Sequence, residues 1–222
     1  MEGAPEERGL RSFRGPRELS QIDVPLGYMM SGPEGHAEIG GDSIGEPRYS
    51  IGLARRDELH LIPAIELAAA RLLVGHAPER VLAEATSESD LERARRAGHL
   101  WVARSSDRPV GFAHVKVLEP GSVHLDELDV HPDHGRRGLG RQLVTAICDW
   151  AARAQFEAVT LCTFRDVLWN RPFYEKLGFD IIPKDALSPA LASVVEDETR
   201  RGLDPARRVV MRRMLPAGAS AA

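Results

Sequence analysis

Regular hydrophobic spacing is absent from the first part of the chain and begins at Tyr49. Residues 1–48 are rich in Gly, Pro, Glu and Arg, and neither the two-residue period of a strand nor the longer period of a helix persists there. Such a composition favours loop structure. We therefore expect an N-terminal extension, largely loop, over residues 1–48, a folded domain over 49–215 and a short tail over 216–222.

Two helices are predicted in the first half of this domain. Residues 57–73 carry apolar side chains at helical spacing, with Pro63 either in the first turn or at a kink. A second helix is expected from Ser89, because Ser89 and Glu92 form the Ser-x-x-Glu pattern of a capping box. Gly98 is placed to end this helix, since glycine adopts the left-handed conformation that closes many helices.

Strand-like segments fill most of the remaining domain. They are residues 49–55, 100–104, 110–118, 122–130, 158–163, 179–182 and 208–215. The short connections 105–109 and 119–121 are typical of antiparallel hairpins. An amphipathic helix is predicted over 139–153 and a short helical stretch over 169–177. Strands and helices mixed in this way indicate a domain of the α/β class.

Composition narrows the class of protein further. A chain of 222 residues with 43% hydrophobic and 28% charged residues is large enough for one globular domain. The net charge of −4 and pI near 6.1 disfavour a protein whose main partner is nucleic acid. Cys148 and Cys162 lie in a predicted helix and a predicted strand, so we expect no disulfide framework and a reducing, cytoplasmic location. The sequence has no run of about eighteen apolar residues and no apolar leader, so we expect neither membrane spanning nor export.

The strongest chemical pattern lies in residues 128–141, where a strand leads through a glycine-rich turn into a helix. Backbone N–H groups and the helix dipole bind anions at such a place, and the absent side chains of Gly138 and Gly140 let a diphosphate approach the backbone. Three arginines add positive charge: Arg136, Arg137 and Arg141. The sequence lacks the Gly-x-Gly-x-x-Gly fingerprint and the Gly-Lys-Ser/Thr of a P-loop here, which disfavours hydride transfer and nucleotide hydrolysis.

This segment resembles the acetyl-CoA signature of the GNAT superfamily of N-acetyltransferases, usually written Arg/Gln-x-x-Gly-x-Gly/Ala. Gly135 stands where that signature has Arg or Gln, which removes a side chain but leaves the N–H groups, with Arg136 as a neighbour. The resemblance covers roughly residues 49–215 in strand and helix order. It implies an α/β (α+β) fold with a mixed, mostly antiparallel sheet of six to seven strands, flanked by about four helices and splayed at the coenzyme strand.

The resemblance also implies which residues hold acetyl-CoA, the acetyl donor of the family. The pyrophosphate is expected at Arg136, Arg137, Gly138, Leu139, Gly140 and Arg141. The pantetheine arm and the thioester are expected at the backbone of Leu128, Asp129 and Val130. Members often bind pantetheine through an asparagine seven residues before a catalytic tyrosine, where this chain has Val167. Asn170 is one helical turn away and either replaces that contact or caps the local helix.

Two residues are expected to carry the proton transfers. An attacking amine with a pKa of about 10.4 must lose a proton, and family members often use a glutamate on the coenzyme strand, which here is Glu127. Asp126 and Asp129 are alternatives, and the other interpretation of Glu127 is an ordinary solvated carboxylate. Residues 169–179 resemble the family's second signature, in which a tyrosine protonates the coenzyme thiolate, and this assigns that role to Tyr174. Alternatively, Tyr174 only packs on the pantetheine.

Two other kinds of chemistry are disfavoured. His124, Asp126, His131 and His134 lie close together in sequence, but their spacing matches no His-x-x-x-His site on a helix, so no metal is expected. Cys162 lies in an apolar strand pattern with no evident histidine partner, which favours direct transfer over a covalent enzyme intermediate.

The expected function is an N-acetyltransferase that moves acetyl from acetyl-CoA to a primary amine within one ternary complex, with no nucleic-acid or membrane partner. A non-catalytic acetyl-CoA sensor is the alternative from another class. The acceptor site is expected around residues 59–85 and 184–207, with a small-molecule amine favoured over a protein N-terminus or lysine. The acidic run Glu196–Glu198 either attracts a cationic substrate or is a solvated helix face. Family members often pair, so a homodimer is a further expectation.

Overall fold

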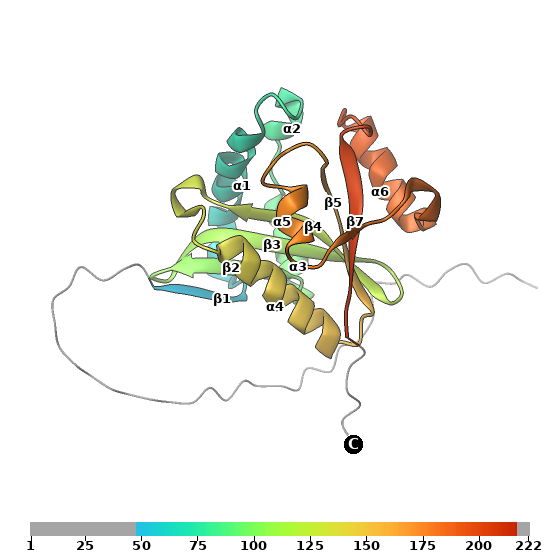
Figure 1. Ribbon diagram of the computed structural model, residues 1–222. Helices are drawn as coiled ribbons and strands as arrows, with labels where there is room; N and C mark the ends of the chain where they lie inside the picture. Colours follow the sequence, from blue (N-terminus) through green and yellow to red (C-terminus); the bar gives the residue numbers. More distant parts are fainter. Residues whose placement is uncertain (1–47, 217–222) are drawn as a thin grey trace, which may run out of the picture. The chain divides into compact units, whose positions relative to one another are not determined.

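The computed structural model describes residues 48–216, and the predicted extension and tail lie outside them except for Arg48 and Pro216. Seven strands of the described residues form one sheet in the order β1-β2-β3-β4-β5-β7-β6 (Figure 1). Their bounds are β1 Tyr49–Leu53, β2 Leu100–Ser105, β3 Arg108–Glu119, β4 Ser122–Val130, β5 Ala158–Phe164, β6 Asp180–Ile181 and β7 Arg208–Met214. Each one overlaps a strand predicted from the sequence.

The sheet consists of two antiparallel halves. Strands β1 to β4 pair antiparallel in chain order, and β5, β7 and β6 also pair antiparallel. One parallel contact joins the halves, where Ser122–Leu125 of β4 pairs with Ala158–Leu161 of β5. The mixed, mostly antiparallel sheet implied by the resemblance is therefore confirmed.

Strands β4 and β5 separate beyond Leu125. His114 of β3 faces Glu127, whereas the next residue of β3, Val115, faces Leu125, so Asp126 is the extra residue of a β-bulge. From Glu127 onward β4 pairs with β3 alone, and the backbone groups on its other edge have no strand partner among the described residues. Figure 1 shows β5 and β7 turning away from β4 at this point. The sheet is thus splayed at the predicted coenzyme strand.

Helices cover both faces of the sheet. The α-helices are α1 Ile62–Ala70, α2 Glu79–Leu82, α3 Glu88–Arg96, α4 Leu139–Arg153, α5 Arg171–Glu175 and α6 Pro189–Arg200, and the 3-10 helices are η1 Arg56–Leu61, η2 Arg71–Leu73, η3 Pro132–His134 and η4 Lys184–Ala186. Helix α4 packs on one face, and α1, α3 and α6 pack on the other (Figure 1). Between residues 48 and 216, no helix is long and apolar enough to cross a membrane.

Helix α4 has the bounds that the hydrophobic pattern predicts. Leu143, Val144 and Ile147 are fully buried between this helix and the sheet. Truncating a leucine at such a position costs about 2–5 kcal/mol, because a cavity is left beside rigid strands. This packing holds the start of α4 in place against the end of β4.

Two details of the helices differ from the sequence analysis. The predicted helix over 57–73 is divided into η1, α1 and η2, with Pro63 in the first turn of α1, where its missing N–H costs no hydrogen bond. The predicted capping box of Ser89 and Glu92 is wrong. Ser87 is the N-cap of α3, and its Oγ accepts a hydrogen bond from the Asp90 N–H (3.2 Å). Ser87 has the extended backbone of an N-cap, whereas Ser89 already lies inside the helix.

The sequence analysis predicts no bounds for helix α6 and suggests a helix face only at Glu196–Glu198. Ser188 caps it by accepting a hydrogen bond from the Leu191 N–H (3.2 Å), and Pro189 is its first residue. Its apolar face is short: Leu191 is buried and Val195 is partly buried against the sheet. A helix with so few apolar positions has a weak periodic signal in the sequence.

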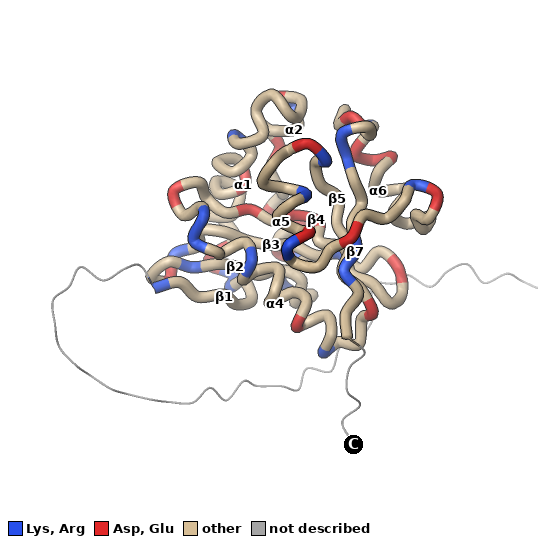
Figure 2. Tube along the Cα trace, in the orientation of Figure 1, with Lys and Arg blue, Asp and Glu red and all other residues tan. Residues whose placement is uncertain are grey.

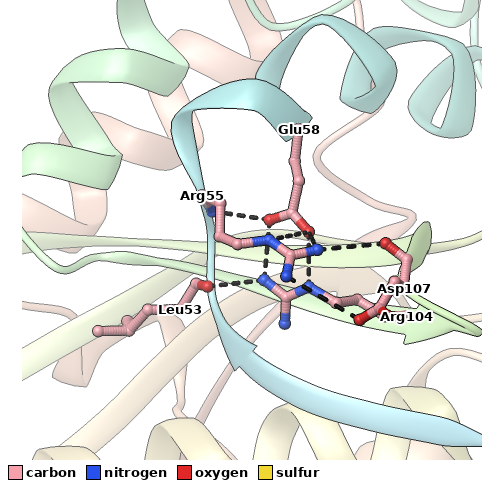
Figure 3. Close-up of polar contacts among 5 residues, drawn as sticks. All are labelled: Leu53, Arg55, Glu58, Arg104 and Asp107. Carbon is pink, nitrogen blue, oxygen red and sulfur yellow. Dashed lines mark hydrogen bonds and ion pairs between the residues drawn. The ribbon is translucent and has the colours of Figure 1, made fainter.

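A buried ion pair fixes the segment that leads into α1 (Figure 3). Arg104 of β2 donates to the carboxylate of Glu58 in η1 through Nε (2.5 Å) and Nη2 (2.8 Å), and also to the Leu53 carbonyl (2.8 Å). The Arg55 N–H donates to the same carboxylate (2.7 Å). Burial alone would raise the pKa of Glu58, but the bonds from Arg104 and Arg55 outweigh it and lower that pKa. The pair ties the start of α1 to β1 and β2.

Candidate active site

The turn before α4 presents unpaired backbone amides. Gly138 is the N-cap of α4 and has a left-handed backbone (φ 79°), which glycine adopts without steric cost. The Gln142 N–H donates to the Gly138 carbonyl (3.0 Å), so the preceding amides of Leu139, Gly140 and Arg141 have no partner within the helix. No side chain of the described residues caps this helix start. An anion bound here would satisfy these amides and interact favourably with the helix dipole.

Positive side chains surround these amides. Arg136, Arg137 and Arg141 are exposed, and Figure 2 shows basic positions in the turn and at the start of α4. Arg136 has a left-handed backbone (φ 57°), which is uncommon for a residue with a Cβ and clusters at functional sites. The predicted anion-binding residues are thus brought together at one end of α4.

Tyr49 supports this turn from β1, and the sequence analysis does not identify it. Its hydroxyl is 3.0 Å from Nδ1 of His134, and the two rings meet edge to face with centroids 5.9 Å apart. The guanidinium carbon of Arg137 lies 5.9 Å from the Tyr49 ring centroid. Tyr49 and His134 are far apart in sequence, so only the pairing of strands brings them together.

A cavity of about 580 Å³ opens beside the splayed strands. Its walls come from α1, the η2–α2 segment, the second half of β4, the end of β5, the segment before α5, and α6. The predicted residues Glu127, Leu128, Asp129, Val130, Asn170 and Tyr174 all line it. The cavity therefore joins the predicted coenzyme strand to both predicted catalytic residues.

The course of β4 along this cavity depends on a close approach to β3. Gly111 of β3 faces Val130. A Cβ on Gly111 would lie 2.9 Å from the Asp129 carbonyl oxygen and 3.1 Å from a methyl group of Val130. Because real side chains do not come so close to backbone, only glycine at this position lets β4 lie where it does.

Glu127 and Asp129 form a coupled pair of carboxyl groups on the cavity side of β4. Burial raises the pKa of Glu127 to about 8, and the charges of Glu66 and Asp126 add to the effect. Burial also raises the pKa of Asp129 well above its usual value, with further contributions from Glu127 and Glu66 and from the hydrogen bond to Glu127. The two carboxyl groups therefore hold a proton between them near neutral pH.

Asp126, the bulged residue, is committed to other partners. Its Oδ2 is 2.8 Å from Nζ of Lys116 and 3.5 Å from Nδ1 of the buried His114. Its side chain is 31% exposed, so water also reaches it. Of the three carboxylates considered as bases, Asp126 is thus the one already neutralised by a cation.

Tyr174 lies on α5 where the cavity meets the α4 side of the sheet. Its ring packs edge to face against Phe173 and Phe179, with centroids 4.9 and 5.8 Å away. Burial, followed by the charges of Glu127 and Asp129, raises the pKa of the Tyr174 hydroxyl. The hydroxyl is therefore protonated at neutral pH and able to donate.

Asn170 occupies the N-cap position of α5 but does not cap the helix with its side chain. Its carbonyl accepts from the Phe173 and Tyr174 amides (2.9 and 3.3 Å), and the residue lines the cavity. Val167, where many family members have asparagine, is buried with Phe164. The amide of Asn170 is thus available to the cavity, whereas the side chain of Val167 points into the core.

The alternative chemistries have little support in the described residues. Burial raises the pKa of the Cys162 thiol to about 12, which disfavours a thiolate nucleophile. His124 is buried and bonded to the Thr160 hydroxyl (3.0 Å), and His134 is bonded to Tyr49. Among residues 48–216, no three His, Cys, Asp or Glu side chains are arranged to hold a metal ion.

These features fit a long ligand that carries a diphosphate. The turn supplies amides and arginines for the diphosphate, and the unpaired edge of β4 supplies backbone N–H groups for an amide-containing arm. The cavity continues past that edge to Glu127, Asp129 and Tyr174. Acetyl-CoA has this sequence of chemical groups.

Comparisons with known proteins agree with this interpretation. The model of the family described as "Acetyltransferase (GNAT) family" matches residues 69–179. Among solved structures, the chain is similar to PaiA N-acetyltransferase from Thermoplasma acidophilum in complex with coenzyme A (TM-score 0.60, 15% identity, covering 75% of this chain and 99% of that one). It is also similar to the ribosomal-protein-S18-alanine N-acetyltransferase from Escherichia coli (TM-score 0.52, 18% identity, covering 79% of this chain and 99% of that one).

A third similar structure is N-acetylglutamate synthase from Neisseria gonorrhoeae, complexed with coenzyme A and N-acetyl-glutamate (TM-score 0.58, 18% identity). The match covers 78% of this chain but 36% of that one, so the synthase contains much that this chain does not match. Identities this low establish the fold that the three structures share with the chain. The family model spans half of the chain, and this chain therefore belongs to the acetyltransferase (GNAT) family and is an acyltransferase.

Proposed function

We propose that this protein transfers acetyl from acetyl-CoA to a small primary amine by direct attack within one ternary complex. The observation that carries the proposal is a single cavity lined by the unpaired edge of β4, the Glu127–Asp129 pair and Tyr174. Acetyl-CoA supplies the acetyl group as a thioester. The residues of the chain then bind, orient and move protons.

Binding of the coenzyme is assigned to the turn and to β4. The amides of Leu139, Gly140 and Arg141, with the side chains of Arg136 and Arg137, take the diphosphate. The backbone of Leu128, Asp129 and Val130 holds the pantetheine arm, and an N–H of this edge stabilises the oxyanion that develops at the carbonyl. Such a donor is worth about 3 kcal/mol. Asn170 takes the pantetheine contact that Val167 cannot make.

Glu127, coupled to Asp129, is the proposed base. An amine arrives as an ammonium ion with a pKa of about 10.4, and a carboxylate with its usual pKa is a weak base toward it. The raised pKa of Glu127 brings the two values closer, which favours proton transfer. Asp126 is a poor candidate because Lys116 neutralises it.

Tyr174 is the proposed acid toward the coenzyme thiolate. Its pKa lies above that of a thiol, so it holds its proton until negative charge develops on sulfur. The raised pKa of Cys162 supports transfer without a covalent enzyme intermediate. The cavity of about 580 Å³, lined from both α1 and α6, favours a small amine over a lysine on a folded protein.

The test is thiol release from acetyl-CoA by the full chain, measured over a panel of amines, amino acids, aminoglycosides and peptides. Tyr174→Phe should lower kcat, whereas the matched change Tyr49→Phe should raise the KM for acetyl-CoA by several-fold and leave kcat nearly unchanged. Binding of acetyl-CoA is measured separately by calorimetry. If acetyl-CoA binds but no acceptor gives release above the blank, the transferase assignment of this site fails and a sensor is favoured.

A further inference from the structure

Most carboxylates that line the cavity are neutralised by a neighbouring cation. Asp126 pairs with Lys116 (2.8 Å), Glu84 with Arg201 (2.7 Å) and Glu198 with Arg208 (2.5 Å). Asp197 pairs with Arg200. The two members of the acidic run that line the cavity, Asp197 and Glu198, are therefore paired with arginines and form a poor site for a cationic substrate.

Three lining carboxyl groups lack such a partner among the described residues: Glu66, Glu127 and Asp129. Glu127 and Asp129 lie two residues apart on β4, and both line the cavity. Glu66 projects from α1 and is held by Thr86, whose N–H and hydroxyl donate to its two oxygens (2.8 and 3.1 Å). These bonds fix the position of the carboxylate without neutralising its charge.

Glu66 is close enough to the pair for their charges to interact. The charge of Glu66 contributes to the raised pKa values of Glu127 and Asp129. Burial raises the pKa of Glu66 itself, and the bonds from Thr86 only partly oppose that effect. Figure 2 shows acidic positions on both α1 and β4. Arg201 and Arg208 partly oppose these increases in pKa, but both already pair with other carboxylates, Glu84 and Glu198. Negative charge at the two acidic positions is therefore costly to bury unless a ligand brings further positive charge.

The cavity thus presents two acidic positions: the neighbouring carboxyl groups of Glu127 and Asp129 on β4, and the carboxyl group of Glu66 on α1, which Thr86 holds in place. The lining of the same cavity also includes the apolar side chains of Ala69 and Ala70 on α1. A ligand that matches this surface has two cationic centres joined by an aliphatic chain.

We propose that the acceptor is a dication, an aliphatic diamine or a longer polyamine, whose reacting amine lies at Glu127 and Asp129 and whose second ammonium pairs with Glu66. This assignment rests on the proposed acetyltransfer at the same cavity and specifies its substrate class. Glu66 is then a specificity-determining residue, because it contacts the part of the substrate that does not react. The amide C–N bond forms at the first amine as the thioester C–S bond breaks; Glu127 accepts the proton of that amine, and CoA leaves as a thiol after Tyr174 protonates its sulfur. The second ammonium keeps its proton throughout.

The test compares linear diamines of three to six methylenes with n-alkylamines and amino alcohols of equal length. The full chain with saturating acetyl-CoA is assayed for kcat/KM, and the affinity of 1,4-diaminobutane is measured by calorimetry in the presence of CoA. We expect a diamine to exceed its alkylamine by about tenfold or more in kcat/KM, as for a partly buried charged contact. The preference should largely disappear in Glu66→Gln, which keeps an oxygen for the Thr86 N–H.

Glu88→Gln is the matched control, since it makes the same charge change on the exposed start of α3 outside the cavity lining. It should leave the diamine preference unchanged, and Glu66→Asp should retain it because the charge remains. The ratio of two substrates on one variant is insensitive to the fraction of folded protein. A loss of stability in Glu66→Gln therefore cannot imitate the expected result.

The outcomes separate this inference from the proposed function. If monoamines and diamines are acetylated equally, or if Glu66→Gln keeps the preference, the dication assignment is overturned while the acetyltransferase remains. A higher kcat/KM for a peptide N-terminus than for every diamine would also overturn the dication assignment and leave the acetyltransferase in place. If 1,4-diaminobutane binds in a Glu66-dependent manner but no thiol is released, the dication site stands and the proposed transfer fails.

Discussion

Replacing Glu127 by glutamine tests the base assignment through the pH dependence of the reaction. With a pKa of about 8, the Glu127 carboxyl is ionised to about 1% at pH 6, about 10% at pH 7 and about 90% at pH 9. Only the ionised form can accept a proton from the amine. The wild-type rate therefore contains a factor that rises nearly a hundredfold over this range and that the variant lacks.

The assay is kcat/KM for one amine, measured for wild type and Glu127→Gln from pH 5.5 to pH 9.5. The ionisation of the amine affects both proteins equally, so it cancels in the ratio of wild type to variant. We expect this ratio to rise about tenfold per pH unit below pH 8, to level off above it, and to reach about 10²–10⁴ at the plateau. A ratio that is independent of pH, or that levels off near pH 4.5, would refute the argument.

Neighbouring charges provide a further check on the cause of the raised pKa. Glu66 and Asp126 raise the pKa of Glu127 through their negative charge, so Glu66→Gln and Asp126→Asn should each move the break in the profile to lower pH. Glu88→Gln should leave the break in place. Because the pKa of Glu127 is higher in the folded protein (about 8) than its usual value of 4.5, this group contributes to the free energy of unfolding below pH 4.5, and the contribution is lost as the pH rises toward 8. Glu127→Gln should remove this part of the pH dependence of unfolding.

Three further changes address stability and coenzyme binding. Glu58→Gln leaves Arg104 buried without a counter-charge and should lower the free energy of unfolding by about 3–5 kcal/mol in denaturant titrations. Hydrogen bonds lower the pKa of Glu58 in the folded protein. The contribution of the Glu58–Arg104 pair to the free energy of unfolding is therefore present above the pKa of Glu58 in the unfolded chain, and it is lost as the pH falls through the pKa in the folded protein. The stability of the variant should accordingly be less sensitive to acid than that of wild type. Gly138→Ala places a Cβ in a left-handed backbone, costs about 1–2 kcal/mol and should weaken CoA binding in calorimetry. Gly111→Ala should displace β4 and raise the KM for acetyl-CoA more than the KM for the amine.

Each of these expectations has an opposing result. A Glu58→Gln variant as stable as wild type would mean that water or a rearranged side chain compensates Arg104. CoA binding by Gly138→Ala at wild-type affinity would show that the left-handed turn is dispensable for the diphosphate. An unchanged coenzyme KM in Gly111→Ala would mean that β4 moves without loss, and that its edge does not bind the pantetheine arm.

The elements that the sequence predicts well are those whose signal is local. The amphipathic period and the preceding glycine define α4 to the residue, and the short Pro- and Gly-containing connections define the β2–β3 and β3–β4 hairpins. The splay at β4 was expected only through the resemblance to a family. A bulge at Asp126 has no signal of its own in the sequence, because it is a property of register.

The parts that could not be predicted depend on contacts between distant residues. Tyr49 reaches His134 only after strand pairing, and Glu66 lines the cavity from α1, whose start the Glu58–Arg104 pair ties to β2. The acidic run Glu196–Glu198 is a case of misleading local charge. It looks suited to a cation in the sequence, whereas in the fold Glu198 is paired with Arg208.

The short parallel contact between β4 and β5 has a consequence for the stability of the whole domain. Four residue pairs hold two half-sheets together, and beyond them the sheet has an open internal seam. In the proposed binding mode, a pantetheine arm laid along that seam would take the place of a missing strand, so the coenzyme would complete the sheet as well as take part in the reaction. Saturation at a hundred times the dissociation constant adds about 2.7 kcal/mol to the free energy of unfolding. The melting temperature of the protein should therefore follow the concentration of CoA, even in variants that have lost every proton-transfer group.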